Sequence, residues 1–169
     1  MTVALDKKRF GTTVSEVTSE YIREGHVHIL QHKEIPSYVS IFRIHGPFLF
    51  GATDKINVIV NRLPDLPPII ILRLRNMTAI DSTGLQALEN FADRVHESGR
   101  LLIICGAREQ PATRMLEAEF HEHVGEENIC RSVAEALNRA KSLYPEAAKQ
   151  LPAGTTWGLG KLAQPEIEG

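Results

Sequence analysis

The stretch Asp81-Ser82-Thr83-Gly84-Leu85 lies where an apolar run ends and an amphipathic run begins. Upstream, Ile69-Ile70-Ile71-Leu72-Arg73-Leu74 follows two prolines, and a short β-branched run of this kind is typical of a buried strand. Downstream, apolar residues recur at helical spacing over 82–97, and a Ser-Gly pair follows. The pattern predicts a strand, an Asp81 N-cap and a helix whose first turn carries two hydroxyl groups.

A helix N-terminus favours added negative charge, because its first N–H groups lack partners and the helix dipole is positive there. A phosphate on Ser82 or Thr83 would therefore be stabilised. Ordinary capping chemistry explains the same residues equally well, since hydroxyl groups and Asp are common at unmodified helix starts. From the residues alone, both interpretations stay open.

Asp-Ser-Thr-Gly-Leu in this setting resembles the signature loop of the STAS domain, the fold shared by bacterial anti-sigma-factor antagonists and the cytosolic tails of SulP anion transporters. Two further stretches match: Gly46-Pro47-Phe48-Leu49-Phe50-Gly51-Ala52 and Leu101-Leu102-Ile103-Ile104-Cys105-Gly106-Ala107. The first is similar to the transporter branch, in which an aromatic, Gly-Ala-containing turn leads into helix one. The resemblance covers about residues 38–143.

The strand at 69–74, the helix at 82–97 and a strand at 101–105 form a βαβ unit, whose right-handed crossover implies parallel neighbours. With the resemblance, the expected fold is α/β: a mixed, partly parallel β-sheet with helices packed mainly on one face. The other expected elements are a strand at 38–44, a helix from Gly51 to Pro64, a helix from Pro111 to Glu119, a short strand at Ile129-Cys130 and a helix over 133–144.

The chain divides into three expected parts. Residues 1–37 are a linker or extension with a candidate edge strand at His26–Leu30, residues 38–144 are the STAS domain, and residues 145–169 are a flexible tail. The tail holds three prolines and four glycines without apolar periodicity. Whether Trp157 docks on the domain or is exposed is left open.

Composition excludes several classes of function. A chain of 169 residues with 43% hydrophobic and 24% charged content fits one globular domain with flanking segments. The net charge of −2 and the scattered Lys and Arg residues argue against nucleic acid and against an anionic membrane surface. The first ten residues lack the apolar core of a secretory signal, and no apolar run approaches the roughly 18–20 residues of a spanning helix.

The sequence offers no metal, cofactor or catalytic site. Cys105 and Cys130 lie in or beside apolar runs and are expected to be reduced, buried thiols. The pairs His26/His28 and His121/His123 lack a third ligand and are interpreted as solvated surface residues. No nucleotide-binding glycine loop and no nucleophile elbow are present, so we expect no cofactor and no enzyme.

The resemblance implies roles for the loop. In STAS proteins of the sigma-factor pathway, a partner kinase phosphorylates the hydroxyl immediately before the glycine, which is Thr83 here; Ser82 is the neighbouring candidate. Asp81 matches the acidic residue two places earlier, and Gly84 leaves the approach uncluttered. Asp81, Ser82, Thr83 and Gly84 are then the partner-facing loop.

The resemblance to the transporter branch implies a regulatory domain at the cytosolic face of the inner (plasma) membrane. Its expected partners are the transmembrane domain of its own transporter, a second copy of the domain or a cytosolic regulatory protein. The alternative is a free-standing anti-sigma-factor antagonist switched by phosphorylation. The Asp81–Gly84 loop fits both, whereas the length of the chain and the departures at 48–52 favour the transporter branch.

Overall fold

The computed structural model describes residues 11–18 and 35–157. The strands are β1 (Thr13–Val17), β2 (Val39–Phe48), β3 (Ile69–Arg73), β4 (Met77–Ile80), β5 (Leu101–Cys105) and β6 (Ile129–Cys130). The helices are α3 (Asn57–Val60), α4 (Ser82–Glu97), α5 (Glu109–Glu117), α6 (His121–Val124), α7 (Val133–Leu143) and α8 (Glu146–Lys149), with 3-10 turns η2 (Thr53–Ile56), η3 (Leu63–Asp65) and η4 (Glu126–Asn128).

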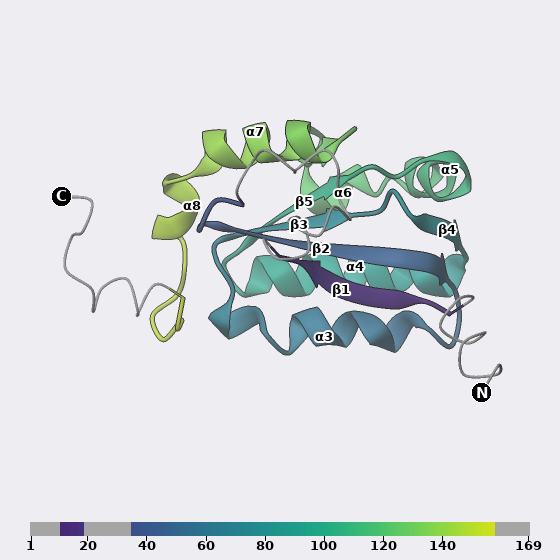
Figure 1. The fold of residues 1–169 in the computed structure, drawn as a ribbon, viewed down its shortest axis with the longest axis horizontal. Helices are drawn as coiled ribbons and strands as arrows, with labels where there is room; N and C mark the ends of the chain where they lie inside the picture. Colours follow the sequence, from purple (N-terminus) through teal and green to yellow (C-terminus); the bar gives the residue numbers. More distant parts are fainter. Residues whose placement is uncertain (1–10, 19–34, 158–169) are drawn as a thin grey trace.

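The strands form one mixed sheet in the order β1-β2-β3-β5-β6 (Figure 1). β1 is antiparallel to β2, whereas β2, β3, β5 and β6 pair in parallel. β4 is also parallel to β2 and pairs with its last residues, from Gly46 to Phe48, with a register shift between Gly46 and Pro47. The expected mixed, partly parallel sheet is therefore confirmed, and its parallel strands all end at the edge where α4 begins.

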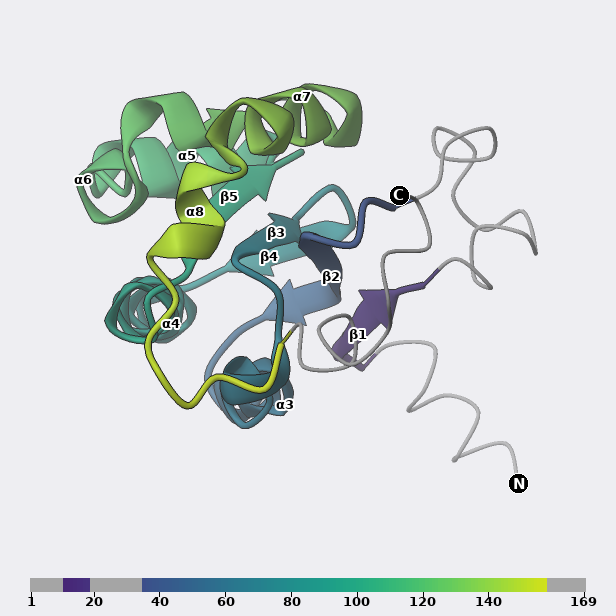
Figure 2. The same cartoon turned by 90° about the vertical axis from the view of Figure 1, so that its left-hand side faces the viewer.

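The sheet separates two apolar cores because strand side chains alternate between its faces. Phe42 and Ile44 of β2 point into the larger core, beneath α3, α4, α5 and α6. Val39 and Ile41 point the other way, into a smaller core closed by α7 and α8. Figure 2 shows α3 and α4 on one side of the sheet and α7 on the other. Most helices thus cover one face, as expected.

The unit β3–α4–β5 follows the predicted bounds closely, because its strands are short continuous apolar runs next to turn residues and its helix has apolar residues at clear helical spacing. Strand β3 ends one residue before the expected Leu74, while α4 and β5 match at both ends. The expected helix over 51–64 is instead broken into η2, α3 and η3, with Pro64 inside η3. Helix α5 begins at Glu109, two residues before the expected Pro111.

The N-terminal edge strand lies at Thr13–Val17, in a segment that the sequence pattern assigned to a linker. It pairs with β2 over Thr13↔His45 to Val17↔Ile41, and Val17 is buried. A polar strand of five residues carries little periodicity of its own, so its partner strand defines it. The candidate strand at His26–Leu30 lies outside the described residues.

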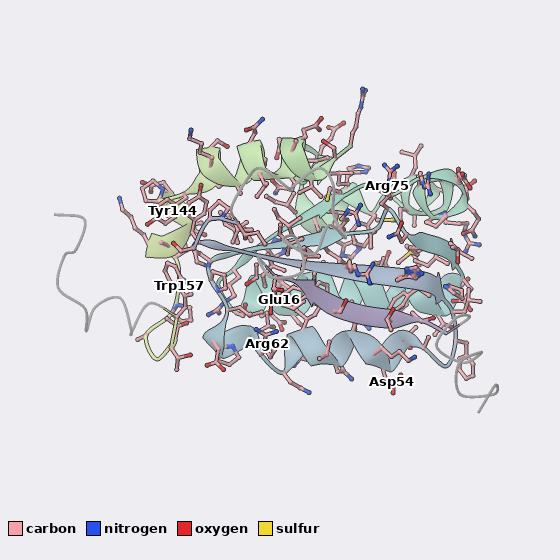
Figure 3. The ribbon with its side chains drawn as sticks, viewed as in Figure 1. Glu16, Asp54, Arg62, Arg75, Tyr144 and Trp157 are labelled. Atoms are coloured by element: carbon pink, nitrogen blue, oxygen red, sulfur yellow. The ribbon has the colours of Figure 1, made fainter. Side chains whose placement is uncertain are left out.

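Residues 145–157 differ from the expected flexible tail, because buried and hydrogen-bonded groups hold them on the domain. Ala147 of α8 is buried in the smaller core. Thr155 Oγ1 accepts a hydrogen bond from the buried Arg100 guanidinium at 2.6 Å. Trp157 docks through its indole N–H, which donates to the Ser37 carbonyl at 3.3 Å (Figure 3). Residues 158–169 lie outside the described part.

Candidate functional site

Asp81 joins the start of α4 to the turn that follows β2. Its Oδ1 accepts the Gly84 N–H at 2.7 Å, which makes it the N-cap, and its Oδ2 accepts the Phe50 N–H at 3.0 Å. The hydrogen bond from Gly84, and then that from Phe50, lowers the pKa of the Asp81 carboxyl. The predicted cap is thus confirmed, and it also positions the 49–51 turn.

Gly84 is required by packing rather than by the approach of a partner. A Cβ at this position would lie 2.1 Å from the Phe48 carbonyl oxygen and 2.9 Å from Ile80 Cγ1. Only a residue without a side chain lets the first turn of α4 lie this close to the end of β2. The glycine of the motif therefore determines where the two preceding hydroxyl groups lie.

Ser82 and Thr83 are both exposed, in the first turn of α4. The Arg114 guanidinium of α5 lies near the first of them, with Nη2 3.4 Å from Ser82 Oγ. The four predicted loop residues Asp81, Ser82, Thr83 and Gly84 come together in one turn. Both hydroxyl groups are accessible to a partner or a modifying enzyme.

Two exposed apolar side chains belong to the turn that Asp81 joins to the start of α4. Phe50 is 83% exposed and Leu49 is 36% exposed, in the turn that Asp81 holds. We call Leu49, Phe50, Ser82 and Thr83 the α4 N-terminal surface. Sequence reasoning used the Phe-Leu-Phe-Gly-Ala run as a turn motif and missed the exposure of Phe50, because apolar residues in a turn give no sign of which ones are covered.

Gln110 is a further residue that the sequence did not indicate. Its side-chain amide accepts the Ile80 N–H at 2.9 Å and donates to the Ile80 carbonyl at 2.8 Å. Strand β4 ends at Ile80, so these two bonds replace the sheet partner that it lacks there. They hold α5 against the residue that precedes the Asp81 cap.

The histidines and cysteines do not form a metal site within the described residues. His123 lies 3.6 Å from a Glu89 oxygen and 3.4 Å from an Asp93 oxygen, both on α4. His121 lines an apolar groove of about 420 Å³ between α5 and the edge strand β6. His26 and His28 lie outside the described part of the chain.

Cys105 and Cys130 are opposed on neighbouring strands, and both are free and buried. Desolvation raises the pKa of Cys105 to about 12 and also raises that of Cys130. Because the reactive form of cysteine is the thiolate, these side chains are inert at neutral pH. The predicted buried thiols are confirmed.

The loop geometry, the sheet order and the placement of α4 agree with a known family. The model of the family described as "STAS domain" matches residues 28–136. The chain belongs to the STAS domain family. The motif Asp81–Gly84 therefore occupies the turn between strand and helix that carries the STAS signature.

Two solved STAS-type structures are similar to this chain. The sulfate transporter family protein from Wolinella succinogenes is 32% identical with a TM-score of 0.61, over 67% of this chain and 93% of that one. The SulP transporter STAS domain from Vibrio cholerae is 29% identical with a TM-score of 0.57, over 66% and 89%. This STAS chain is thus similar to the STAS domains of SulP transporters.

A curated relative is the bicarbonate transporter BicA from Synechocystis, which is 28% identical over 70% of this chain and 21% of its own length. The chain spans about a fifth of the length of the curated relatives that it matches. None of the helices formed by the described residues is long and apolar enough to cross a membrane.

Proposed function

We propose that this STAS chain is the regulatory portion of a SulP-type anion transporter and that it docks through the α4 N-terminal surface. The observation that carries the proposal is the exposure of Phe50 in a turn that Asp81 holds in place. An aromatic side chain that is pre-ordered and exposed supplies contact area at low entropic cost. Its role is regulatory rather than catalytic.

The similarity to SulP transporter STAS domains supports a position at the cytosolic face of the inner (plasma) membrane. The partner is the transmembrane domain of the same transporter, a second copy of this domain or a cytosolic regulatory protein. The relative BicA is a bicarbonate transporter and the Wolinella succinogenes protein belongs to the sulfate transporter family, and both similarities support a parent transporter for an anion of the sulfate or bicarbonate type.

Docking is tested by measuring anion uptake into vesicles that contain the parent transporter with Phe50→Asp in this domain. A carboxylate in the interface costs desolvation, so uptake and co-purification of the domain with its partner should both fall. Val58→Asp is the matched control, because Val58 is 47% exposed on α3, outside the α4 N-terminal surface. Equal effects of the two substitutions would remove this surface from the proposal.

The second candidate is a free-standing antagonist that is switched by phosphorylation, and the exposure of Ser82 and Thr83 supports it. A phosphate there would add a charge of about −1.5 to −2 beside Phe50 and repel or desolvate a partner surface. Incubation with candidate serine/threonine kinases, followed by mass spectrometry, should locate phosphate at Thr83 or Ser82 and lose it in Thr83→Ala/Ser82→Ala. Modification confined to other sites would exclude the switch and leave the docking proposal untouched.

A further inference from the structure

Three arginines that are far apart in the sequence lie beyond the carboxyl ends of parallel strands. Arg75 follows β3, Arg108 follows β5 and Arg131 follows β6. The carboxyl ends of parallel strands lie along one edge of the sheet, and crevices at that edge are common ligand sites in α/β folds. Figure 3 shows Arg75 at this edge, between α5 and the start of α7.

Two adjoining hollows connect these arginines. The larger, of about 200 Å³, is lined by His45, Arg75, Asn76, Thr78, Arg108 and Glu109, among others. The smaller adds Arg73, Arg131 and Ser132 and shares Arg75 with the first. We call the larger hollow the arginine crevice. Most of its polar side chains can donate hydrogen bonds, and Glu109 is the carboxylate among its lining residues.

Positive charge exceeds negative charge in the crevice, because Arg75 and Arg108 line it together with the one carboxylate of Glu109. Within the described residues, no carboxylate forms an ion pair with Arg75, Arg108 or Arg131. Arg108 Nε donates to the Arg75 carbonyl at 3.2 Å, so the Arg108 side chain lies against the backbone of a second cationic residue. Like charges that line one hollow repel each other, and an anion bound between them would reduce that repulsion.

The backbone holds Arg75 in this position. A Cβ on Gly106 would lie 3.2 Å from Arg75 N and 3.3 Å from Arg75 Cβ, and Gly106 has a φ of 81°. The glycine after β5 thus lets the loop after β3 approach closely. Arg75 enters the crevice from a closely packed loop and not from a free segment.

We propose that the arginine crevice binds a protonated tetrahedral oxyanion, either inorganic phosphate or, in its monoprotonated form, the phosphate group of a monoester. Arginine forks match the oxygen geometry of such an anion, and Thr78 and Asn76 offer neutral donors. Glu109 selects the protonated form, because an ionised carboxylate accepts a hydrogen bond from a phosphate O–H but repels an anion without a proton. Sulfate, which carries no proton at neutral pH, is disfavoured for this reason.

Isothermal titration of the chain with sodium phosphate at pH 7 and low ionic strength tests the site. We expect saturable binding of one phosphate per chain. Arg75→Gln and Arg108→Gln should each weaken the affinity for phosphate about tenfold or more, since each removes a charge-assisted contact. Arg94→Gln is the matched control, because Arg94 is an exposed arginine on α4. An unchanged fold is checked by thermal unfolding. Absence of saturable binding, or an equal loss in Arg94→Gln, would overturn the proposal.

The selectivity depends on Glu109. Sulfate should bind at least about tenfold more weakly than phosphate to the unaltered chain, and Glu109→Gln should reduce or remove that difference because an amide can donate to either anion. An unaltered chain that binds the two anions equally would contradict the protonated-oxyanion assignment.

The source of the phosphate is distinguished by flotation with two kinds of vesicle. One kind is plain phosphatidylcholine and the other also contains phosphatidylinositol 4-phosphate. If the natural ligand is a lipid headgroup, the phosphoinositide vesicles should retain the unaltered chain but not Arg108→Gln, and the plain vesicles should retain neither. Binding of soluble phosphate without retention on either vesicle identifies a soluble phosphate instead. Equal retention of the chain and of Arg108→Gln on the phosphoinositide vesicles would contradict a role for the crevice in lipid binding.

Discussion

The α4 N-terminal surface and the arginine crevice lie at the same edge of the sheet but are built in opposite ways. The first comes from two short runs, 49–50 and 82–83, that a single carboxylate joins. The second comes from β2, from the segment that joins β3 to β4 and from the residues after β5, none of which carries a motif. The contrast shows that a parallel sheet collects residues from separate strand ends, and that sequence patterns detect only the local kind of site.

The largest expected effect tests how strictly the α4 N-terminal surface depends on its glycine. Gly84→Ala places a Cβ 2.1 Å from the Phe48 carbonyl oxygen, so the free energy of unfolding should fall by about 2–4 kcal/mol. The measurement is urea denaturation. Gly51→Ala is the control: it has open space but a φ of 94°, and should cost about 1 kcal/mol. Equal losses of unfolding free energy in the two variants would show that backbone conformation, and not the contact with the Phe48 carbonyl, explains the need for glycine at position 84.

Asp81→Ala removes the carboxylate that joins the two runs of that surface. The melting temperature should fall at pH 7, by less than in Gly84→Ala, because both the helix cap and the Phe50 bond are lost. The pKa of Asp81 lies below its ordinary 3.8 in the folded state, so its contribution is present above that value and is lost as the pH falls through the folded pKa. The difference in melting temperature between the unaltered chain and Asp81→Ala should therefore become smaller in acid. A difference that stays constant with pH would contradict the role given to the ionised Asp81 carboxylate.

A substitution in the arginine crevice should not lower the free energy of unfolding, in contrast to the two substitutions at the α4 N-terminal surface. In phosphate-free buffer, Arg108→Gln should leave the free energy of unfolding unchanged or raise it by up to about 0.5 kcal/mol, since it removes one of the two arginine charges that line the hollow. Added phosphate should raise the melting temperature of the unaltered chain more than that of the variant. A clear loss of stability in Arg108→Gln without phosphate would mean that the arginine is structural.

The smallest effect on stability is expected at Phe50. Because its side chain is 83% exposed, Phe50→Ser should change the free energy of unfolding by less than about 0.5 kcal/mol while weakening partner docking. Binding at this surface should also depend less on salt than phosphate binding in the crevice, because apolar contact is not screened. A destabilised Phe50→Ser variant would show that the ring packs against the domain itself.

Much of the local structure could be predicted. The runs at 69–74 and 101–105 are continuous and apolar, the run at 82–97 has a helical period, and Pro, Asp or Gly residues stand at their boundaries. The structure has elements there with nearly the same bounds. Strand β4 was missed because four residues between two loops show no alternation; its pairing with the last residues of β2 defines it. The cap at Asp81 was found, whereas its second bond to Phe50 joins positions 31 residues apart and leaves no local signal.

By itself, the sequence determined the βαβ unit, the exposed hydroxyl groups at the start of α4 and the STAS family, because each depends on contacts between near neighbours in the chain. Only the tertiary structure decided that Thr13–Val17 is an edge strand, that 145–157 packs on the domain and that scattered arginines face one crevice. The physical reason is that the charge or apolarity of a residue can be read at its own position. Its neighbours in space depend on which strands pair, and those strands are distant in the chain.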